Sequence, residues 1–453
     1  MTDALLLLPP AGRPYPRDFA AFAPPLGLAY LAAALGAAGY SALIRDYYAT
    51  PFRAADLDHV LATERPRVVG LSTYTENMPA ALLIAAQVKQ RDAGIRVVLG
   101  GPHVSYTDPR RLPADTVDAV VRGEAEVSLV HLVRRWLEGG NAVPIAGVTY
   151  RGDDGRLLVG AHAAAPVDPA SLPVPARDLL PMATYRAGGC LLAARGCGRS
   201  CIFCVSWRGG GSPLRARPLD HVMAELCLLV TGAGFARLHF WDESFTADRA
   251  RTLDLCRRLR DEGPACSWSA GTRVDLVDPE LLAEMAAVGC VALNFGVESG
   301  DPGVLRRIGK RIALDQVGRS VAMAARCGIY TTYNFMMPFP DDTRATIRRT
   351  LDYALRLLDM GAGGVSFNIS TPFPGTALYE RAARFGLTLH DAGWEDYHYW
   401  NPVFSTRHLD RDAIRELFFE ATLAVAQRRA NDAPGPAAGT RARYQGSGDH
   451  AAG

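Results

Sequence analysis

The chain has 453 residues, of which 49% are hydrophobic, and this length accommodates two or three domains with full cores. Acidic and basic residues nearly balance to a formal net charge of +2, so the composition argues against a nucleic-acid partner. The nine cysteines are an odd and mostly scattered set, which excludes a disulfide framework and favours a reducing, cytoplasmic location. The start lacks the basic region of a signal peptide, and prolines and glycines interrupt the apolar stretch 21–40. We interpret that stretch as a buried helix and expect no membrane association.

Residues 1–145 alternate between short apolar strands and helices. The pattern predicts strands at 4–8, 41–46, 67–72, 95–100 and 119–122, and helices at 26–38, 79–93 and 124–137. Such alternation predicts an α/β fold with a doubly wound parallel sheet. Ligands of these sheets bind beyond the carboxyl ends of the strands, where the chain places residues 9–14, 72–77, 100–103 and 123–124.

The rest of the chain divides into four further parts. A hairpin around Asp153 and Gly155 and a proline-rich linker occupy residues 146–184. Strand–helix alternation returns at 185–395 and predicts a partial (β/α)6 barrel, whose working face lies at the carboxyl ends of its strands. Its six strands are expected at 190–194, 237–241, 267–273, 291–297, 330–336 and 365–370. Residues 396–430 are expected to form a C-terminal helical extension, and 431–453 a disordered tail.

Three cysteines, Cys197, Cys201 and Cys204, follow the first barrel strand at the spacing C-x3-C-x2-C. A zinc site normally takes four protein ligands, and ordinary iron–sulfur clusters are closed by four cysteines. Three closely spaced thiolates without a fourth therefore predict an iron–sulfur cluster with one open iron. Phe203, between two of the cysteines, would either shield this cluster from water or pack into the core.

This cysteine spacing resembles that of the radical S-adenosylmethionine superfamily. The resemblance implies a [4Fe–4S] cluster whose open iron binds the amino and carboxylate groups of S-adenosyl-L-methionine. It also implies reductive cleavage of that cosubstrate to a 5′-deoxyadenosyl radical. The required electron would come from a reducing partner such as flavodoxin or ferredoxin.

Charged residues at the ends of the next strands extend the resemblance. Asp242 and Glu243 are similar to the motif that holds the methionine amino group by charge-assisted hydrogen bonds. Their structural alternative is a helix N-cap with Glu in the first turn. Arg273 would make a bidentate contact with the methionine carboxylate, or instead a structural ion pair with Asp275 or Glu298.

The fourth, fifth and sixth strands end in loops that resemble the family's cosubstrate and substrate loops. Glu298 lies in the Gly-Val-Glu-Ser-Gly run 296–300, where glycines permit close backbone approach and a carboxylate would accept hydrogen bonds from ribose hydroxyls. Met337 lies in loop 336–340, which with loop 371–376 would line the adenine and substrate space; ordinary proline-rich turns are the alternative. Further candidate substrate-contacting residues are Tyr74, Glu76, Tyr333, Asn334, Asn368 and Ser370; the alternative for those inside strands is packing in the core.

The front part also has a relative. Residues 24–31, 100–103 and 122–126 resemble the cobalamin-binding domain of cobalamin-dependent radical S-adenosylmethionine enzymes. The resemblance makes Gly100, Gly101 and His103 candidate cofactor-binding residues and cobalamin a possible third cofactor. The loop after the first strand contains no histidine, so the axial-ligand motif of cobalamin mutases is absent. Many members of the subfamily also lack it, and some relatives keep the domain only as a scaffold.

Two enzymatic functions follow from these resemblances. In the first, the deoxyadenosyl radical takes a hydrogen atom from a carbon of a small specialised metabolite, which is then C-methylated by methylcobalamin. The alternative is a cobalamin-free radical dehydration or deoxygenation of an aminoglycoside-type sugar diol. A sensor protein would require an output module, and the sequence shows no such module.

Overall fold

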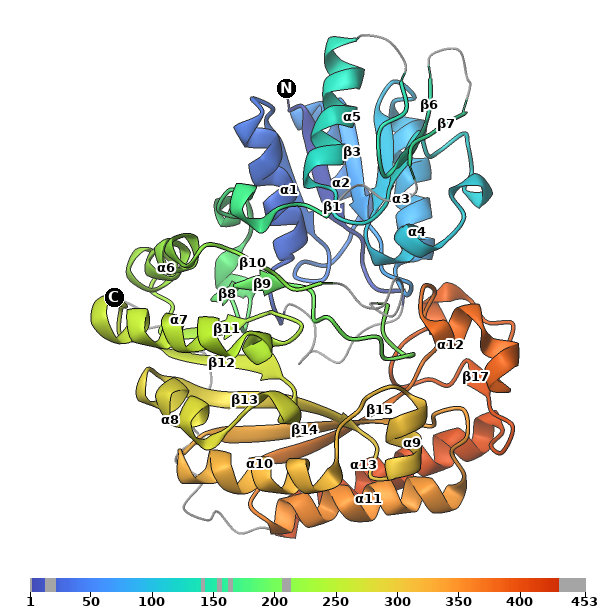
Figure 1. Cartoon of the computed structure of the whole chain (residues 1–453). Helices are drawn as coiled ribbons and strands as arrows, with labels where there is room; N and C mark the ends of the chain where they lie inside the picture. Colours follow the sequence, from blue (N-terminus) through green and yellow to red (C-terminus); the bar gives the residue numbers. More distant parts are fainter. Residues whose placement is uncertain are drawn as a thin grey trace. The chain divides into compact units, whose positions relative to one another are not determined.

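The computed structural model describes residues 2–12, 22–139, 143–152, 157–161, 166–205 and 213–431 (Figure 1). The chain divides into two compact units. Unit 1 comprises residues 1–188 together with 392–397, and unit 2 comprises residues 189–391 and 398–453. The expected tail 431–453 lies outside the described residues except for Asn431. Within the described ranges, no helix is both long and apolar enough to span a membrane.

Unit 1 is built on a seven-stranded sheet in the order β2-β1-β3-β4-β5-β6-β7. The first five strands in this order are parallel, and the last two pair antiparallel. The strands are β1 (Ala4–Leu8), β2 (Ala42–Asp46), β3 (Val68–Ser72), β4 (Arg96–Gly100), β5 (Ala119–Val121), β6 (Val148–Arg151) and β7 (Leu157–Val159). The helices are α1 (Leu26–Ala37), α2 (Ala54–Glu64), α3 (Met78–Arg91), α4 (Pro102–Tyr106) and α5 (Glu126–Glu138).

Both faces of this sheet are covered by helices, which explains why its strands are continuous apolar runs. All five residues of β1 are buried. Its even-numbered leucines pack with α1 and α5, whereas Leu5 and Leu7 pack with α2 and α3. The predicted doubly wound parallel sheet is therefore confirmed. Helix α2 was not predicted, because only Leu57 and Leu61 of its eleven residues are buried and they give little periodic signal.

The predicted hairpin is confirmed as the antiparallel pair β6–β7, although residues 153–156 of its turn lie outside the described ranges. It extends the sheet of unit 1 at β5 and is not a separate module. The expected linker is also packed into unit 1. Leu180 and Tyr185 are buried against its core, and the Tyr185 hydroxyl donates to Asp46 Oδ2 at 2.7 Å. Burial of these apolar groups ties the segment down.

Unit 2 contains a parallel six-stranded sheet in the order β15-β14-β13-β12-β11-β8. The strands are β8 (Cys190–Leu191), β11 (Arg237–Phe240), β12 (Ser267–Thr272), β13 (Cys290–Glu298), β14 (Tyr330–Met337) and β15 (Gly364–Ile369). The helices are α6 (Leu219–Cys227), α7 (Arg249–Glu262), α8 (Pro279–Ala287), α9 (Pro302–Arg307), α10 (Leu314–Arg326), α11 (Arg344–Asp359), α12 (Ala377–Glu380) and α13 (Arg411–Asn431). The predicted order of six strand–helix units followed by a last helix is confirmed.

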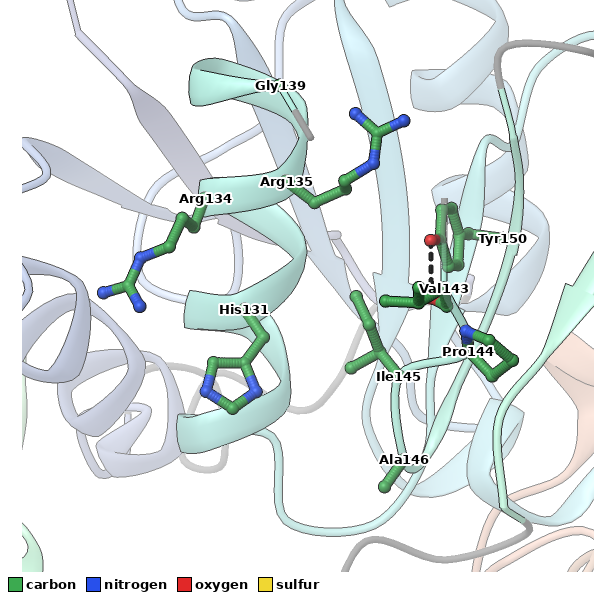
Figure 2. Close-up of a pocket in the computed structure, with 9 residues that line it drawn as sticks. All are labelled: His131, Arg134, Arg135, Gly139, Val143, Pro144, Ile145, Ala146 and Tyr150. Atoms are coloured by element: carbon green, nitrogen blue, oxygen red, sulfur yellow. Dashed lines mark hydrogen bonds between the residues drawn. The ribbon is translucent and has the colours of Figure 1, made fainter. Parts of the chain in front are cut away.

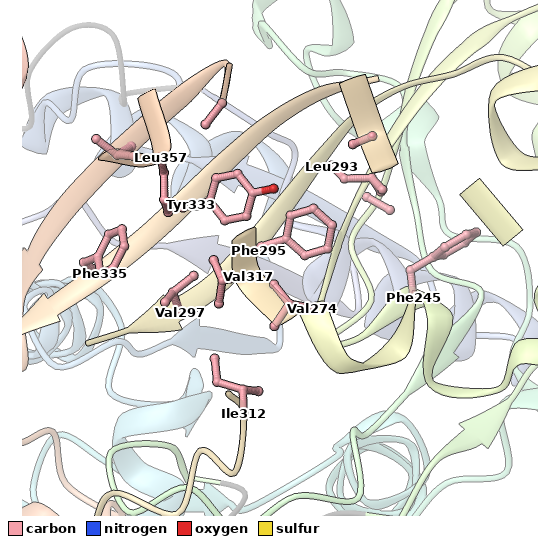
Figure 3. Close-up of a cluster of buried hydrophobic side chains, with 14 of the residues drawn as sticks. Phe245, Val274, Leu293, Phe295, Val297, Ile312, Val317, Tyr333, Phe335 and Leu357 are labelled. Atoms are coloured by element: carbon pink, nitrogen blue, oxygen red, sulfur yellow. The ribbon is translucent and has the colours of Figure 1, made fainter. Parts of the chain in front are cut away.

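The core of unit 2 lies between this sheet and its helices. Figure 3 shows Phe295, Tyr333 and Phe335 in this core, and the rings of Phe295 and Tyr333 stack with their centroids 5.3 Å apart. Alternate residues of the same strands face the other side of the sheet, where Asn294 and Asn334 are only partly buried. One side of the sheet is thus apolar and packed, and the opposite side carries polar groups.

The first predicted barrel strand, 190–194, is in fact two short strands. β8 joins the six-stranded sheet, whereas β9 (Ala194–Arg195) pairs antiparallel with β10 (Arg215–Ala216). Side chains form hydrogen bonds with the backbone groups between these two strands. Arg217 donates to the Leu192 carbonyl at 2.7 Å, and Asp242 accepts from the Ala193 N–H at 2.8 Å. The β9–β10 pair closes the base of the segment that carries the three cysteines.

Candidate active site

The three cysteines lie on the loop between β9 and β10. Gly196 and Gly198 adopt φ values of 88° and 66°, a left-handed conformation that favours glycine. The loop is anchored to the segment after α9, because the Ile202 N–H donates to the Ile308 carbonyl at 3.1 Å and Cys201 Sγ lies 3.7 Å from the Gly309 carbonyl oxygen. Cys201 is buried, and Cys197 and Cys204 are partly exposed. The loop is therefore attached to this segment at Cys201 and Ile202.

The donor set of this loop fits an iron–sulfur cluster. All three thiols are free, and thiolates are the ligands that such clusters take. Burial raises the pKa of the Cys201 thiol, while the nearby cations Lys310 and Arg273 act in the opposite direction and favour the thiolate. Within the described ranges no group of three His, Cys, Asp or Glu side chains is already arranged as a metal cage. Phe203 packs beside Phe339 at 5.5 Å between centroids, and its shielding role stays a prediction.

Beside Cys201 lies a buried charged network at the carboxyl ends of β12 and β13. Lys310 Nζ lies 2.8 Å from Glu298 Oε1, and both side chains are less than a tenth exposed. Arg273 makes a two-bond ion pair with Asp275, at 2.8 and 3.1 Å, and donates to the Lys310 carbonyl at 2.7 Å. The ion-pair alternative for Arg273 is thus confirmed for Asp275, and its contact with the methionine carboxylate stays a prediction.

Lys310 is the residue of this network that the sequence analysis missed. The chain has only two lysines among its 49 basic residues, so a lysine in an arginine-rich chain was the available signal. The space around Lys310 Nζ is narrow, because a Cβ placed on Gly296 would lie only 2.8 Å from this nitrogen. A compact ammonium fits there, whereas the larger guanidinium of an arginine would not.

The backbone around Glu298 is strained. Glu298 has a φ of 76°, a conformation that non-glycine residues rarely adopt, and the β13–β14 register shifts between Gly296 and Glu298. A Cβ on Gly296 would lie 2.5 Å from Glu298 Oε1. Strain of this kind persists only where the surroundings enforce it, and it is concentrated at functional sites.

We expect Gly296→Ala to disturb this network directly. The added methyl group would overlap the Glu298 carboxylate and the Lys310 ammonium, and overpacking of this kind typically costs about 1–3 kcal/mol of unfolding free energy. Denaturant unfolding of the purified protein measures the effect. Gly271→Ala is the matched control, because a Cβ there meets only one atom within 4 Å, at 4.0 Å. Equal stability of the two variants would contradict the expectation.

The acidic pair after β11 holds the backbone that leads into the cysteine loop. Asp242 Oδ1 accepts from Ala193, and Glu243 Oε2 accepts from the Gly196 N–H at 2.9 Å. The alternative of a helix N-cap is wrong, because Asp248 caps α7 by accepting from the Arg251 N–H at 3.0 Å. A contact of Asp242 or Glu243 with the methionine amino group stays a prediction.

Burial raises the pKa of Asp242 from 3.8 to about 7. The folded state therefore binds the proton more tightly than the unfolded state, so Asp242 lowers stability as pH rises from about 4 to 7 and exerts its full cost above that range. We expect Asp242→Asn, which keeps the acceptor oxygen, to unfold with a weaker pH dependence and to gain stability relative to the wild type at pH 8. Thermal unfolding at pH 5 and pH 8 measures this, and parallel pH profiles would contradict it.

Of the predicted substrate-contacting residues in unit 2, two lie on the polar side of the sheet. Asn334 and Asn368 are partly exposed, and Asn334 Oδ1 accepts from Ser366 at 2.7 Å. Tyr333 packs in the core, where it is fully buried and bonded to Ser320. Ser370, which follows β15, is 1% exposed and donates to the Pro338 carbonyl, and its contact with a substrate stays a prediction. Met337 is packed in the core with 2% exposure, and Met336 is partly buried. The predicted place of Met337 beside the adenine stays a prediction.

The remaining predicted residues lie at the carboxyl edge of the sheet in unit 1. Gly100 accepts from the Thr73 N–H at 2.7 Å, and a Cβ on Gly101 would lie 2.7 Å from Thr73 backbone atoms. Gly101, with φ 97°, is therefore needed for close backbone approach. Tyr74 is exposed, and Glu76 accepts from Tyr48 at 3.2 Å. These loops lie at the edge where doubly wound sheets bind their ligands.

His103 is not presented to a ligand at this edge. It is 4% exposed, its Nδ1 lies 3.3 Å from Thr75 Oγ1, and its ring meets that of Trp394 at 4.9 Å. Burial lowers its pKa from 6.5 to about 4, so the ring is neutral at physiological pH. A contact between the His103 ring and a cofactor would require this packing to open, and the contact stays a prediction.

A cavity of about 370 Å³ in unit 1 lies away from all these residues (Figure 2). Its lining comes from the last turns of α5 and from the segment that precedes β6, and includes His131, Arg134, Arg135 and Tyr150. Helix α5 runs back from the carboxyl end of β5, so its last turns lie at the amino edge of the sheet. This position is opposite to the edge at which doubly wound sheets bind their ligands.

Comparison with known proteins gives the same two parts. The B12 binding domain family matches residues 14–133, and the Radical SAM superfamily matches residues 191–354. An uncharacterized methyltransferase of Pyrococcus horikoshii is 32% identical over 94% of this chain and 92% of its own. Cytidylyl-2-hydroxyethylphosphonate methyltransferase of Streptomyces wedmorensis is 25% identical over 84% of this chain and 82% of its own.

A solved structure shows the same fold. The radical S-adenosylmethionine methyltransferase TsrM of Kitasatospora setae, with cobalamin and a [4Fe–4S] cluster bound, superposes with a TM-score of 0.71 at 21% identity. The match covers 86% of this chain and 81% of that one. The chain therefore belongs to the radical S-adenosylmethionine superfamily, within the methyltransferase family that carries an N-terminal B12-binding domain.

Proposed function

We propose that this protein transfers a methyl group to a carbon atom of a small metabolite, using S-adenosyl-L-methionine, a [4Fe–4S] cluster and cobalamin. The observation that carries the proposal is the position of Cys201 beside Arg273, Lys310 and Glu298 at the carboxyl ends of β12 and β13. When bound, the cluster supplies the electron that splits the cosubstrate, and cobalamin supplies the methyl group. The family relationship supports this set of cofactors.

Residues of unit 2 would hold the cluster and the ribose of the cosubstrate. Cys197, Cys201 and Cys204 would hold the iron, on a loop in which Gly196 and Gly198 adopt left-handed backbone conformations. Glu298 uses Oε1 for Lys310, and we assign Oε2 to a ribose hydroxyl of the cosubstrate. The Lys310 ammonium keeps this carboxylate charged inside a buried site, where an unpaired charge would be costly.

Arg273 and the acidic pair would hold the methionine end of the cosubstrate. Arg273 is fixed by Asp275 and by the Lys310 carbonyl, so its guanidinium is already oriented before a carboxylate binds. Asp242 and Glu243 are fixed by the backbone of residues 193–196, which places them next to the cysteine loop. We assign the methionine amino group to this pair.

The alternative of radical dehydration is not favoured. The relatives that align over most of the chain include two named as methyltransferases, and their alignments extend through both the B12-binding and the radical parts. For the substrate we propose only a chemical class: a small molecule with a carbon atom that can be methylated.

Mass spectrometry of the anaerobic reaction tests the proposal. Protein reconstituted with iron, sulfide and hydroxocobalamin would be given S-adenosyl-L-methionine carrying a CD3 group as the only methyl source, a reductant and candidate substrates. Cytidylyl-2-hydroxyethylphosphonate, named for one relative, and aminoglycoside-type sugars are first candidates. A product that gains CD3 supports methyl transfer, and a product that loses water without gaining CD3 would overturn it. The variant with all three loop cysteines changed to Ala is the blank.

A further inference from the structure

Residues 392–397 belong to unit 1, although the chain on both sides of them belongs to unit 2. They contain a short 3-10 turn, Trp394–Asp396. Trp394 is partly buried against the apolar core that α2 and α3 form with the sheet of unit 1. The chain thus returns to unit 1 for six residues after completing the six-stranded sheet of unit 2.

The returning segment lies at the carboxyl edge of the sheet. The Trp394 ring meets the ring of His103 edge-on, at 4.9 Å and 71°, and His103 belongs to α4, which follows β4 directly. Trp394 also packs against Tyr397 of the same segment at 5.1 Å. The indole is therefore one of the groups that keep His103 buried and bonded to Thr75 in the loop after β3.

Glu395 lies at the point where the strand order of the sheet reverses. Gly12 follows β1, and its N–H donates to the Glu76 carbonyl, in the loop after β3, at 3.2 Å. A Cβ on Gly12 would lie 2.5 Å from Glu395 Cβ and 2.8 Å from the Glu76 carbonyl oxygen. β1 lies between β2 and β3: the chain passes from β1 to β2 on one side and then crosses to β3 on the other side. Such a switch point is where doubly wound sheets bind their ligands.

We propose that residues 392–397 are a structural part of the cobalamin-binding edge of unit 1. In this arrangement Trp394 is a positioning residue that holds His103 and the loop after β3, and Glu395 closes against Gly12 at the switch point. This inference rests on the proposed function, since it requires cobalamin to bind at this edge. It assigns a role in cobalamin binding to a segment that lies outside the residues matched by the B12 binding domain family and beyond those matched by the Radical SAM superfamily.

Titration with hydroxocobalamin, followed by absorbance, tests the inference on the full chain with its cluster reconstituted. We expect Trp394→Ala and Gly12→Ala each to raise the dissociation constant by roughly tenfold, because each loosens the loops that the ligand must find in place. Trp394→Phe keeps an aromatic ring against His103 and should stay within about threefold of the wild type. Iron content should not change in any of them.

Two controls separate positioning from general loss of packing. A Cβ on Gly36 in α1 meets nothing within 4 Å, so Gly36→Ala should bind cobalamin as the wild type does. Leu61 packs in the same core as Trp394 but on α2, so Leu61→Ala reports the cost of weakening that core alone. Gly12→Ala repeats the test without removing any core side chain, should Trp394→Ala fold poorly.

The outcomes are distinguishable. Unchanged affinity in both Trp394→Ala and Gly12→Ala overturns this inference and leaves the proposed function standing. Equal weakening by Leu61→Ala and Trp394→Ala, with Gly12→Ala unchanged, also overturns it, because the effect would then be loss of core packing. A wild-type protein that takes up no cobalamin overturns both the inference and the proposed function.

Discussion

Changing Cys197, Cys201 and Cys204 together to Ala should reduce the iron of anaerobically reconstituted protein to background and abolish its broad visible absorbance. The reason is that these thiolates are the proposed protein ligands, and iron–sulfur clusters depend on cysteine thiolates for attachment. Iron and sulfide analysis, together with the absorbance spectrum, measures the result.

The chain offers a matched control for this experiment. Cys227, Cys266 and Cys327 are also free and partly exposed, but they lie outside the cysteine loop. Changing these three to Ala removes the same number of thiols and should leave the iron content at the wild-type level. Near-normal iron in the first triple variant, or equal loss in both, would refute the assignment of the cluster to the loop.

Glu298→Gln should weaken both folding and binding of S-adenosyl-L-methionine. The variant leaves the Lys310 ammonium buried without its partner, which typically costs about 3–5 kcal/mol of unfolding free energy. Loss of the carboxylate should also cost on the order of 1.5–3 kcal/mol of cosubstrate binding, the usual contribution of a hydrogen bond to a charged group. Denaturant unfolding and anaerobic calorimetry of the cluster-loaded protein measure the two effects, and iron content should be retained.

A double variant separates these two effects. Glu298→Gln combined with Lys310→Met removes the unpaired charge, so stability should recover while cosubstrate binding stays weak. Arg249→Gln removes a solvent-exposed ion pair with Asp278 and serves as the control, for which we expect little change in either quantity. Cosubstrate binding at the wild-type level in Glu298→Gln would assign Glu298 a structural role only.

The difference between predicted and observed roles has the same origin at several positions. Arg273 was placed correctly at the end of β12, but its pairing with Asp275 and the Lys310 carbonyl depends on a segment that arrives 37 residues later. Tyr333 lies inside β14, and the sequence left both substrate contact and core packing open for it. Strand alternation puts Tyr333 on the core side and its neighbour Asn334 on the polar side.

The sequence by itself determined the order of most strands and helices, the presence of two strand–helix parts and the three-cysteine loop. These features are written in local patterns: apolar runs such as Ala4–Leu8, glycines at turns, and the fixed spacing of three thiols. Only the tertiary structure decided that Lys310 pairs with Glu298, that β6 and β7 extend the first sheet, and that Trp394 returns to pack on His103. Each of these contacts joins residues that are remote along the chain, and such a contact leaves no periodic signal in either of the segments that it brings together.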